Sequence, residues 1–157
     1  MRKLYVLRGL PGSGKSTYAR TLAQLVAEPD MFRYDENNEY EFDSTRNREV
    51  NAKAQMLCEF AMRTLKLQAV AVTATFTKTD MVMQYVRLGR KYGYSVTVIE
   101  CVGDYGNVHG VPEKVLSQMR EGWEPFDEEL ANQEGVSLWL VEDGGRNVLY
   151  VPEKERA

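Results

Sequence analysis

The chain has 157 residues, of which 43% are hydrophobic and 27% are charged, and its formal net charge at pH 7 is -3. A chain of this size and composition forms a single globular domain, which excludes a fibrous or intrinsically disordered protein. The acidic balance gives no general attraction for nucleic acid, and the apolar runs are too short to cross a bilayer, so we expect a cytoplasmic protein without a membrane partner.

Strands and helices are predicted to alternate from the start of the chain. Residues 3–9 (KLYVLRG) form a short β-rich run that ends on glycine and proline. The apolar spacing in 15–28 predicts a helix directly after the glycine-rich segment. A second strand is expected at 31–35 (MFRYD), followed by a long amphipathic helix over 48–67.

The same alternation continues to the C-terminus. A third strand is expected at 68–76, a helix over 80–93 and a β-branched fourth strand at 94–102. Residues 112–124 begin with proline, as helices often do, and 136–152 contain two β-runs around a glycine turn, which indicates a hairpin. We therefore predict one α/β domain spanning 1–157, with four parallel core strands, helices on both faces and a C-terminal β-hairpin at the edge.

A glycine-rich motif lies between the first predicted strand and the first predicted helix. The stretch GLPGSGKS matches the P-loop pattern G-x-x-x-x-G-K-[ST], in the strand and helix context that the motif requires. Glycines let backbone N–H groups converge on a polyphosphate, and the helix directs its positive N-terminal end at the same place. The residues expected to bind the nucleotide are Gly9, Pro11, Gly12, Ser13, Gly14, Lys15, Ser16 and Thr17.

Two side chains of this motif have distinct chemical roles. Lys15 is expected to contact the β- and γ-phosphates, and the Ser16 hydroxyl to bind Mg²⁺. The sequence therefore predicts ATP and Mg²⁺ as cofactors.

Asp35 is the acidic residue at the end of the predicted second strand. In an α/β sheet, ligands gather at the carboxyl ends of the strands. A carboxylate there can accept the proton of an incoming hydroxyl or order the water shell of a metal.

Three stretches together carry a family resemblance. The segments LRGLPGSGKST, RYD and NVHGVPEKVLSQMREGWEP make 1–125 similar to the polynucleotide 5′-hydroxyl kinases, a group of P-loop kinases that includes phage enzymes. The resemblance implies transfer of the γ-phosphate of ATP to a polynucleotide 5′-hydroxyl. It also implies catalytic roles for Lys15 and for Asp35, the latter as the general base that binds the acceptor.

The chain departs from this family pattern at two places. Ala74 stands where relatives carry an aspartate at the end of the third strand, and Gly106 stands where they carry a lid arginine. No Lys or Arg occurs between Lys91 and Lys114, so a cation for the transition state must come from elsewhere. The candidates are Arg120, which we assign as catalytic, and Arg87 or Arg90.

The segment after Asp35 is expected to border the acceptor site. It contains Glu36, Glu39, Glu41 and Asp43, and these acids disfavour a long phosphate backbone. With Arg48 and His109 as further substrate-binding candidates, the expected partner is a short or single-stranded nucleic-acid 5′ end.

Two other functions stay open on the same scaffold. The acidic acceptor segment is also compatible with a small-molecule or nucleotide kinase. Ala74 and Gly106 are compatible with a catalytically impaired protein that binds ATP and acts as a switch.

Overall fold

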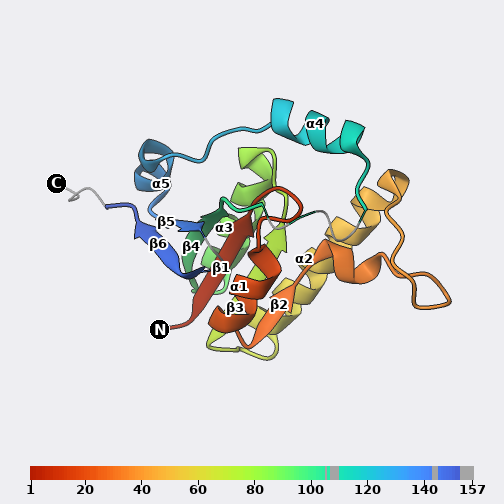
Figure 1. Ribbon diagram of the computed structural model, residues 1–157. Helices are drawn as coiled ribbons and strands as arrows, with labels where there is room; N and C mark the ends of the chain where they lie inside the picture. The colour runs from red at the N-terminus through yellow and green to blue at the C-terminus, as the bar shows by residue number, and fades with distance from the viewer. Residues whose placement is uncertain (105, 107–109, 143–144, 153–157) are drawn as a thin grey trace.

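The computed structural model describes residues 1–104, 106, 110–142 and 145–152. The described residues form a six-stranded sheet in the order β2-β3-β1-β4-β5-β6, with helices on both faces (Figure 1). The strands are β1 (Lys3–Arg8), β2 (Leu25–Ala27), β3 (Ala69–Ala74), β4 (Ser95–Cys101), β5 (Ser137–Glu142) and β6 (Asn147–Tyr150). The helices are α1 (Lys15–Leu22), α2 (Asn47–Arg63), α3 (Thr79–Lys91), α4 (Glu113–Glu121) and α5 (Glu128–Glu134), with short 3₁₀ turns η1 (Pro29–Phe32) and η2 (Ser44–Arg46).

The sheet is parallel from β2 to β5, and only β6 runs antiparallel to its neighbour. The last residue of β1, Arg8, lies opposite Ala74 of β3 and Glu100 of β4. The segments that follow these three strands therefore leave the sheet at the same edge, which confirms the predicted α/β class.

Alternate residues of β1 enter two different cores. Leu4 and Val6 pack with buried residues of α2 and α3, whereas Tyr5 and Leu7 pack with Tyr18 and other residues on the opposite face, which α1 covers. A parallel strand covered on both faces is apolar throughout, and this explains the continuous run LYVL.

The structure corrects the predicted second strand. The first helix ends at Leu22, and Leu25–Ala27 form β2, which pairs with β3 in register Leu25↔Val70. Met31 and Phe32 belong to η1, and Tyr34 makes only an isolated bridge to Tyr40. The apolar residues after Leu22 satisfy helical spacing, but the pairing of the Gln24 N–H with the Ala69 carbonyl extends the backbone there.

The other elements lie close to their predicted positions. The β5 and β6 hairpin at the sheet edge is confirmed, although its turn residues 143–144 lie outside the described residues. The segment between α4 and β5 contains α5, which was not predicted. Within the described residues, no helix combines the length and the apolar character needed to span a membrane.

Close packing of α3 on the sheet generates a test of this fold. A Cβ at Gly89 would lie 2.8 Å from Val96 Cγ2 and 2.9 Å from Leu4 Cδ2, both of which belong to buried side chains. We expect Gly89→Val to destabilise the protein by about 1–3 kcal/mol through overpacking, measured by urea unfolding. The control is Gln84→Val on the exposed face of the same helix, and an equal loss in both variants would contradict this packing.

Candidate functional site

The glycine-rich loop between β1 and α1 brings its backbone close to other backbone groups. Gly12 and Gly14 have φ values of 83° and 84°, which glycine adopts without strain. A Cβ at Gly12 would overlap the carbonyl oxygen of Gly106, and one at Gly9 would lie 2.7 Å from the carbonyl oxygen of Cys101. The motif therefore requires glycine at these positions for its shape.

The loop presents donors that suit an anion. The Ser13 hydroxyl is buried and has no hydrogen-bond partner among the described residues, and no side chain caps the N-terminus of α1. Lys15 Nζ lies 3.3 Å from the carbonyl oxygen of Leu10. Desolvation lowers the pKa of Lys15, and the Asp30 carboxylate opposes this shift. Donors in this arrangement fit a phosphate group, which would satisfy them together.

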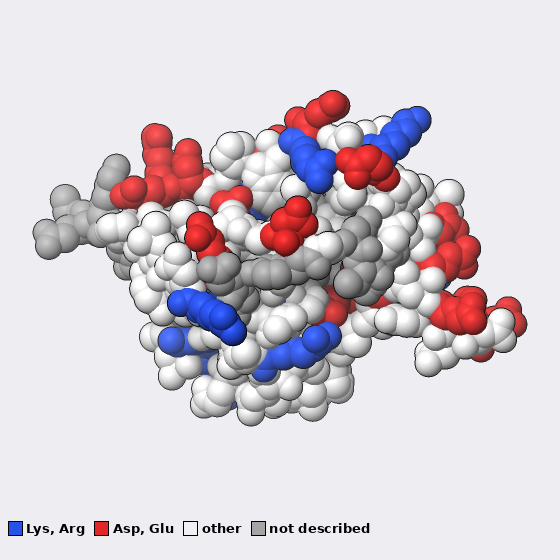
Figure 2. Space-filling model, in the orientation of Figure 1, with Lys and Arg blue, Asp and Glu red and all other residues white. Residues whose placement is uncertain are grey.

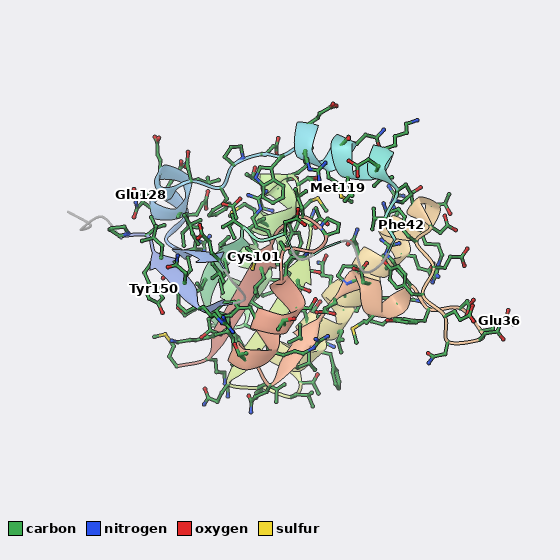
Figure 3. The ribbon with its side chains drawn as sticks, viewed as in Figure 1. Glu36, Phe42, Cys101, Met119, Glu128 and Tyr150 are labelled. Carbon is green, nitrogen blue, oxygen red and sulfur yellow. The ribbon has the colours of Figure 1, made fainter. Side chains whose placement is uncertain are left out.

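The loop opens into a pocket of about 1090 Å³. The wall is formed by the start of α1, the segment from β2 to η1, the segment after β3 and the inner side of α4. The predicted nucleotide-binding residues that line it are Pro11, Gly12, Gly14, Lys15, Ser16 and Thr17. Figure 3 shows Met119 on α4, and this residue lines the pocket together with Val115 and Gln118, so α4 forms one wall of it.

Asp35 does not lie where the sequence placed it. Its Oδ1 accepts hydrogen bonds from the N–H groups of Asn37 and Glu39, both at 2.9 Å, in an exposed turn. The adjacent Glu36 lies at the far tip of this projecting segment (Figure 3). The predicted position at a strand end is wrong because the strand ends at Ala27, and Asp35 is not among the residues that line the pocket.

Asp30 occupies the position expected of Asp35. It follows β2 by three residues, lines the pocket, and is the carboxylate with the strongest electrostatic effect on Lys15. Glu28, which has one buried oxygen without a hydrogen-bond partner among the described residues, lies beside it. In the sequence, the residues EPD that follow the apolar run 25–27 could have indicated a carboxylate at a strand end. The helical spacing of apolar residues in 15–28 predicted a helix there instead.

Two side chains hold the Asp30 carboxylate. Arg33 Nε donates to Asp30 Oδ1 at 2.9 Å, and the Tyr40 hydroxyl donates to the same oxygen at 3.3 Å. Burial, and next the Asp30 carboxylate, raise the pKa of Tyr40, so its hydroxyl stays protonated as a donor. The remaining Arg33 nitrogens donate to the Asp43 carbonyl and to Asn47 Oδ1. The Arg33 charge is therefore already engaged within the protein.

The predicted arginines lie outside the pocket lining. Arg120 Nη1 contacts Glu113 at 3.2 Å and its side chain is 54% exposed, so it lies on the outer side of α4. Arg87 pairs with Asp80, and Arg90 pairs with Glu134. Among described residues, the cationic side chains that line the pocket are Lys15, Arg20, Arg33 and Lys78.

The remaining substrate-binding predictions are not tested by the structure. Arg48 is exposed in the first turn of α2 and does not line the pocket. His109 lies outside the described residues. Acidic side chains gather over the projecting segment before α2 (right side of Figure 2), where Glu36, Glu39 and Glu41 are exposed.

The segment after α4 is fixed to the segment after β3. The Glu124 N–H donates to the Thr77 carbonyl at 2.7 Å, and Lys78 Nζ donates to the Gly122 carbonyl at 2.8 Å. Buried Arg8 donates to the Glu124 carbonyl and lies over the Trp123 ring, 4.0 Å from its centroid. These contacts hold the C-terminal end of α4 beside the end of β1, where the glycine-rich loop of residues 9–16, called the phosphate loop below, begins.

Comparison with known families agrees with this geometry. Residues 4–109 match the family model described as AAA domain. The chain belongs to the AAA domain family. The human NEDD4-binding protein 2 is 29% identical in an alignment of 137 residues that covers 78% of this chain but only 8% of that protein.

Solved structures show that this AAA domain has a P-loop kinase-like fold. Kti12 from Chaetomium thermophilum, in complex with ADP-AlF3, is 16% identical with a TM-score of 0.63, and the match covers 88% of each chain. A gluconokinase from Sinorhizobium meliloti 1021 is 17% identical with a TM-score of 0.56, covering 90% of this chain and 84% of its own. At these identities the likeness concerns the fold, and the narrower resemblance to polynucleotide kinases stays a prediction.

The phosphate loop generates a direct binding test. Lys15→Ala removes a charged donor, so we expect roughly ten- to hundredfold weaker binding of Mg·ATP by isothermal titration calorimetry. Lys53→Ala on the exposed side of α2, where it pairs with Glu49, serves as the control and should bind as the wild type does. Unchanged affinity in Lys15→Ala would contradict a nucleotide site at this loop.

Proposed function

We propose that this AAA domain is an ATP-dependent kinase that transfers a phosphoryl group to a hydroxyl acceptor, with Asp30 as the general base. The observation that carries the proposal is the presence of Asp30 and Lys15 in one pocket at the carboxyl edge of the sheet. A nucleotide complex of a protein with this fold and a kinase of this fold support it.

The phosphate loop would hold the donor nucleotide. Backbone N–H groups around Gly12 and Gly14, with the Ser13 hydroxyl, would receive the phosphate oxygens, and Lys15 would balance their charge. The described residues contain no group of three or more His, Cys, Asp or Glu that could hold a metal, so Mg²⁺ would be shared between Ser16 and the nucleotide. The bound Mg·ATP supplies the phosphoryl group and the leaving ADP.

Asp30 would act on the acceptor. Arg33 and Tyr40 both contact Oδ1, and this fixes the orientation of the carboxylate. The acceptor oxygen forms a bond to the γ-phosphorus as the bond from that phosphorus to the ADP oxygen breaks, and the acceptor proton passes to Asp30. In other enzymes too, the side chain that activates the attacking group is oriented by a hydrogen bond from a further residue.

The surroundings of the pocket favour a small hydroxylated acceptor. Exposed acids occupy the projecting segment, and Arg33 is engaged by protein groups, so this side offers little attraction for a polyanion. One observation supports the alternative, a single-stranded 5′-hydroxyl end. Tyr34 lines the pocket and is 46% exposed, so its ring is available to stack on a terminal base.

Two aspartate variants distinguish the general base proposed here, Asp30, from the one predicted from the sequence, Asp35. We expect Asp30→Asn to lower the rate of phosphoryl transfer roughly a hundred- to ten-thousandfold, because asparagine cannot accept the proton. Asp35→Asn should retain wild-type transfer. The measurement follows labelled γ-phosphate from ATP onto acceptor, and the opposite ranking of the two variants would restore Asp35 as the base.

A screen of acceptors decides between the two substrate classes. Labelled ATP is presented with nucleosides, sugars and short single-stranded 5′-hydroxyl oligonucleotides, and we expect labelling of a small molecule. Labelling of the oligonucleotides alone would establish the 5′-end alternative. Tight ATP binding without transfer to any acceptor would favour the ATP-binding switch.

A further inference from the structure

A kinase needs a cation near the transferring phosphoryl group, and the sequence does not provide one at the usual lid position. Gly106 lies there, and Arg120 is directed to Glu113 rather than into the pocket. Because charge builds on the phosphoryl oxygens in the transition state, a positioned cation can raise the rate by several orders of magnitude.

The cationic side chains described in the pocket differ in whether they can contact the transferring phosphoryl group. Lys15 belongs to the phosphate loop, and Arg33 is held by Asp30, Asp43 and Asn47. Arg20 lies five residues beyond Lys15 on α1, about 7 Å further along the helix axis and away from the N-terminal end that receives phosphate. Lys78 is the remaining cation among the described pocket residues.

Lys78 lies on the correct edge of the sheet. It follows β3, whose last residue Ala74 is opposite Arg8, directly before the phosphate loop. Its Nζ donates to the Gly122 carbonyl at 2.8 Å, at the end of α4. An ammonium group has three donors, so this contact leaves two for a ligand. The side chain is exposed and four carbons long, so it can move within the pocket.

We propose that Lys78 supplies the cation that stabilises the transferring phosphoryl group, and that its contact with Gly122 joins this cation to the end of α4. The inference rests on the proposed kinase function. It places the cation on the segment after β3, in a chain that lacks both the acid at position 74 and the lid arginine.

The test uses binding of a phosphoryl-transfer mimic and needs no acceptor. Calorimetry compares Mg·ADP with Mg·ADP plus fluoroaluminate for wild type, Lys78→Gln, Lys78→Arg and Lys114→Gln. Glutamine keeps a donor for the Gly122 carbonyl but removes the charge, arginine keeps the charge, and Lys114 is an exposed lysine of α4 outside the pocket lining.

We expect the wild type to bind the mimic more tightly than ADP. Lys78→Gln should lose roughly tenfold or more of this preference with ADP affinity unchanged, as expected when a transition-state contact is removed. Lys78→Arg should keep most of the preference, and Lys114→Gln should match the wild type. Thermal unfolding of each variant confirms that the fold is retained.

Other results would overturn the proposal in distinguishable ways. A Lys78→Gln variant that keeps the full preference would overturn the role of Lys78 alone, as would a loss of the preference in Arg120→Gln instead. A wild type with equal affinity for ADP and for the mimic would overturn the kinase function and the role of Lys78 together.

Discussion

The central place of β1 in the sheet is the constraint on which the site depends. Because β1 pairs in parallel with both β3 and β4, the chain leaves all three strands at one edge. The phosphate loop, the segment that carries Lys78 and the backbone of Cys101 therefore meet at this edge. Pairing of β2 with the other side of β3 adds Glu28 and Asp30 to the same edge.

Arg8 couples this edge to the segment that follows α4, the helix that forms one wall of the pocket. Its side chain is fully buried, and desolvation lowers its pKa, although an arginine remains charged in a protein. The guanidinium donates hydrogen bonds to the carbonyl oxygens of Phe76 and Glu124 and stacks over the ring of Trp123. Its Nη1 has no hydrogen-bond partner among the described residues. A buried charge is costly unless such groups surround it, so the segment after α4 is held in one position.

Charge is distributed unevenly around the pocket. The acids of the projecting segment are exposed and face solvent, as the right side of Figure 2 shows. Within the pocket, Asp30 lies with Arg33 and with the hydroxyl of Tyr40, and desolvation lowers the pKa of the partly buried Lys15. Water screens the buried Arg33 guanidinium less than it screens the exposed acids, so the interactions of Arg33 within the pocket are stronger than those of the projecting segment.

The sequence by itself determined the α/β class, the phosphate loop and the approximate positions of most helices and strands. These features follow from local patterns: glycine and lysine spacing in GLPGSGKS, apolar runs such as LYVL, and the periodicity of α2 and α3. The tertiary structure alone decided that the second strand is Leu25–Ala27, because pairing with β3 outweighed helical spacing. For the same reason Asp30 and Lys78 line the pocket whereas Asp35 and Arg120 do not, since the position of a side chain depends on neighbours distant in the sequence.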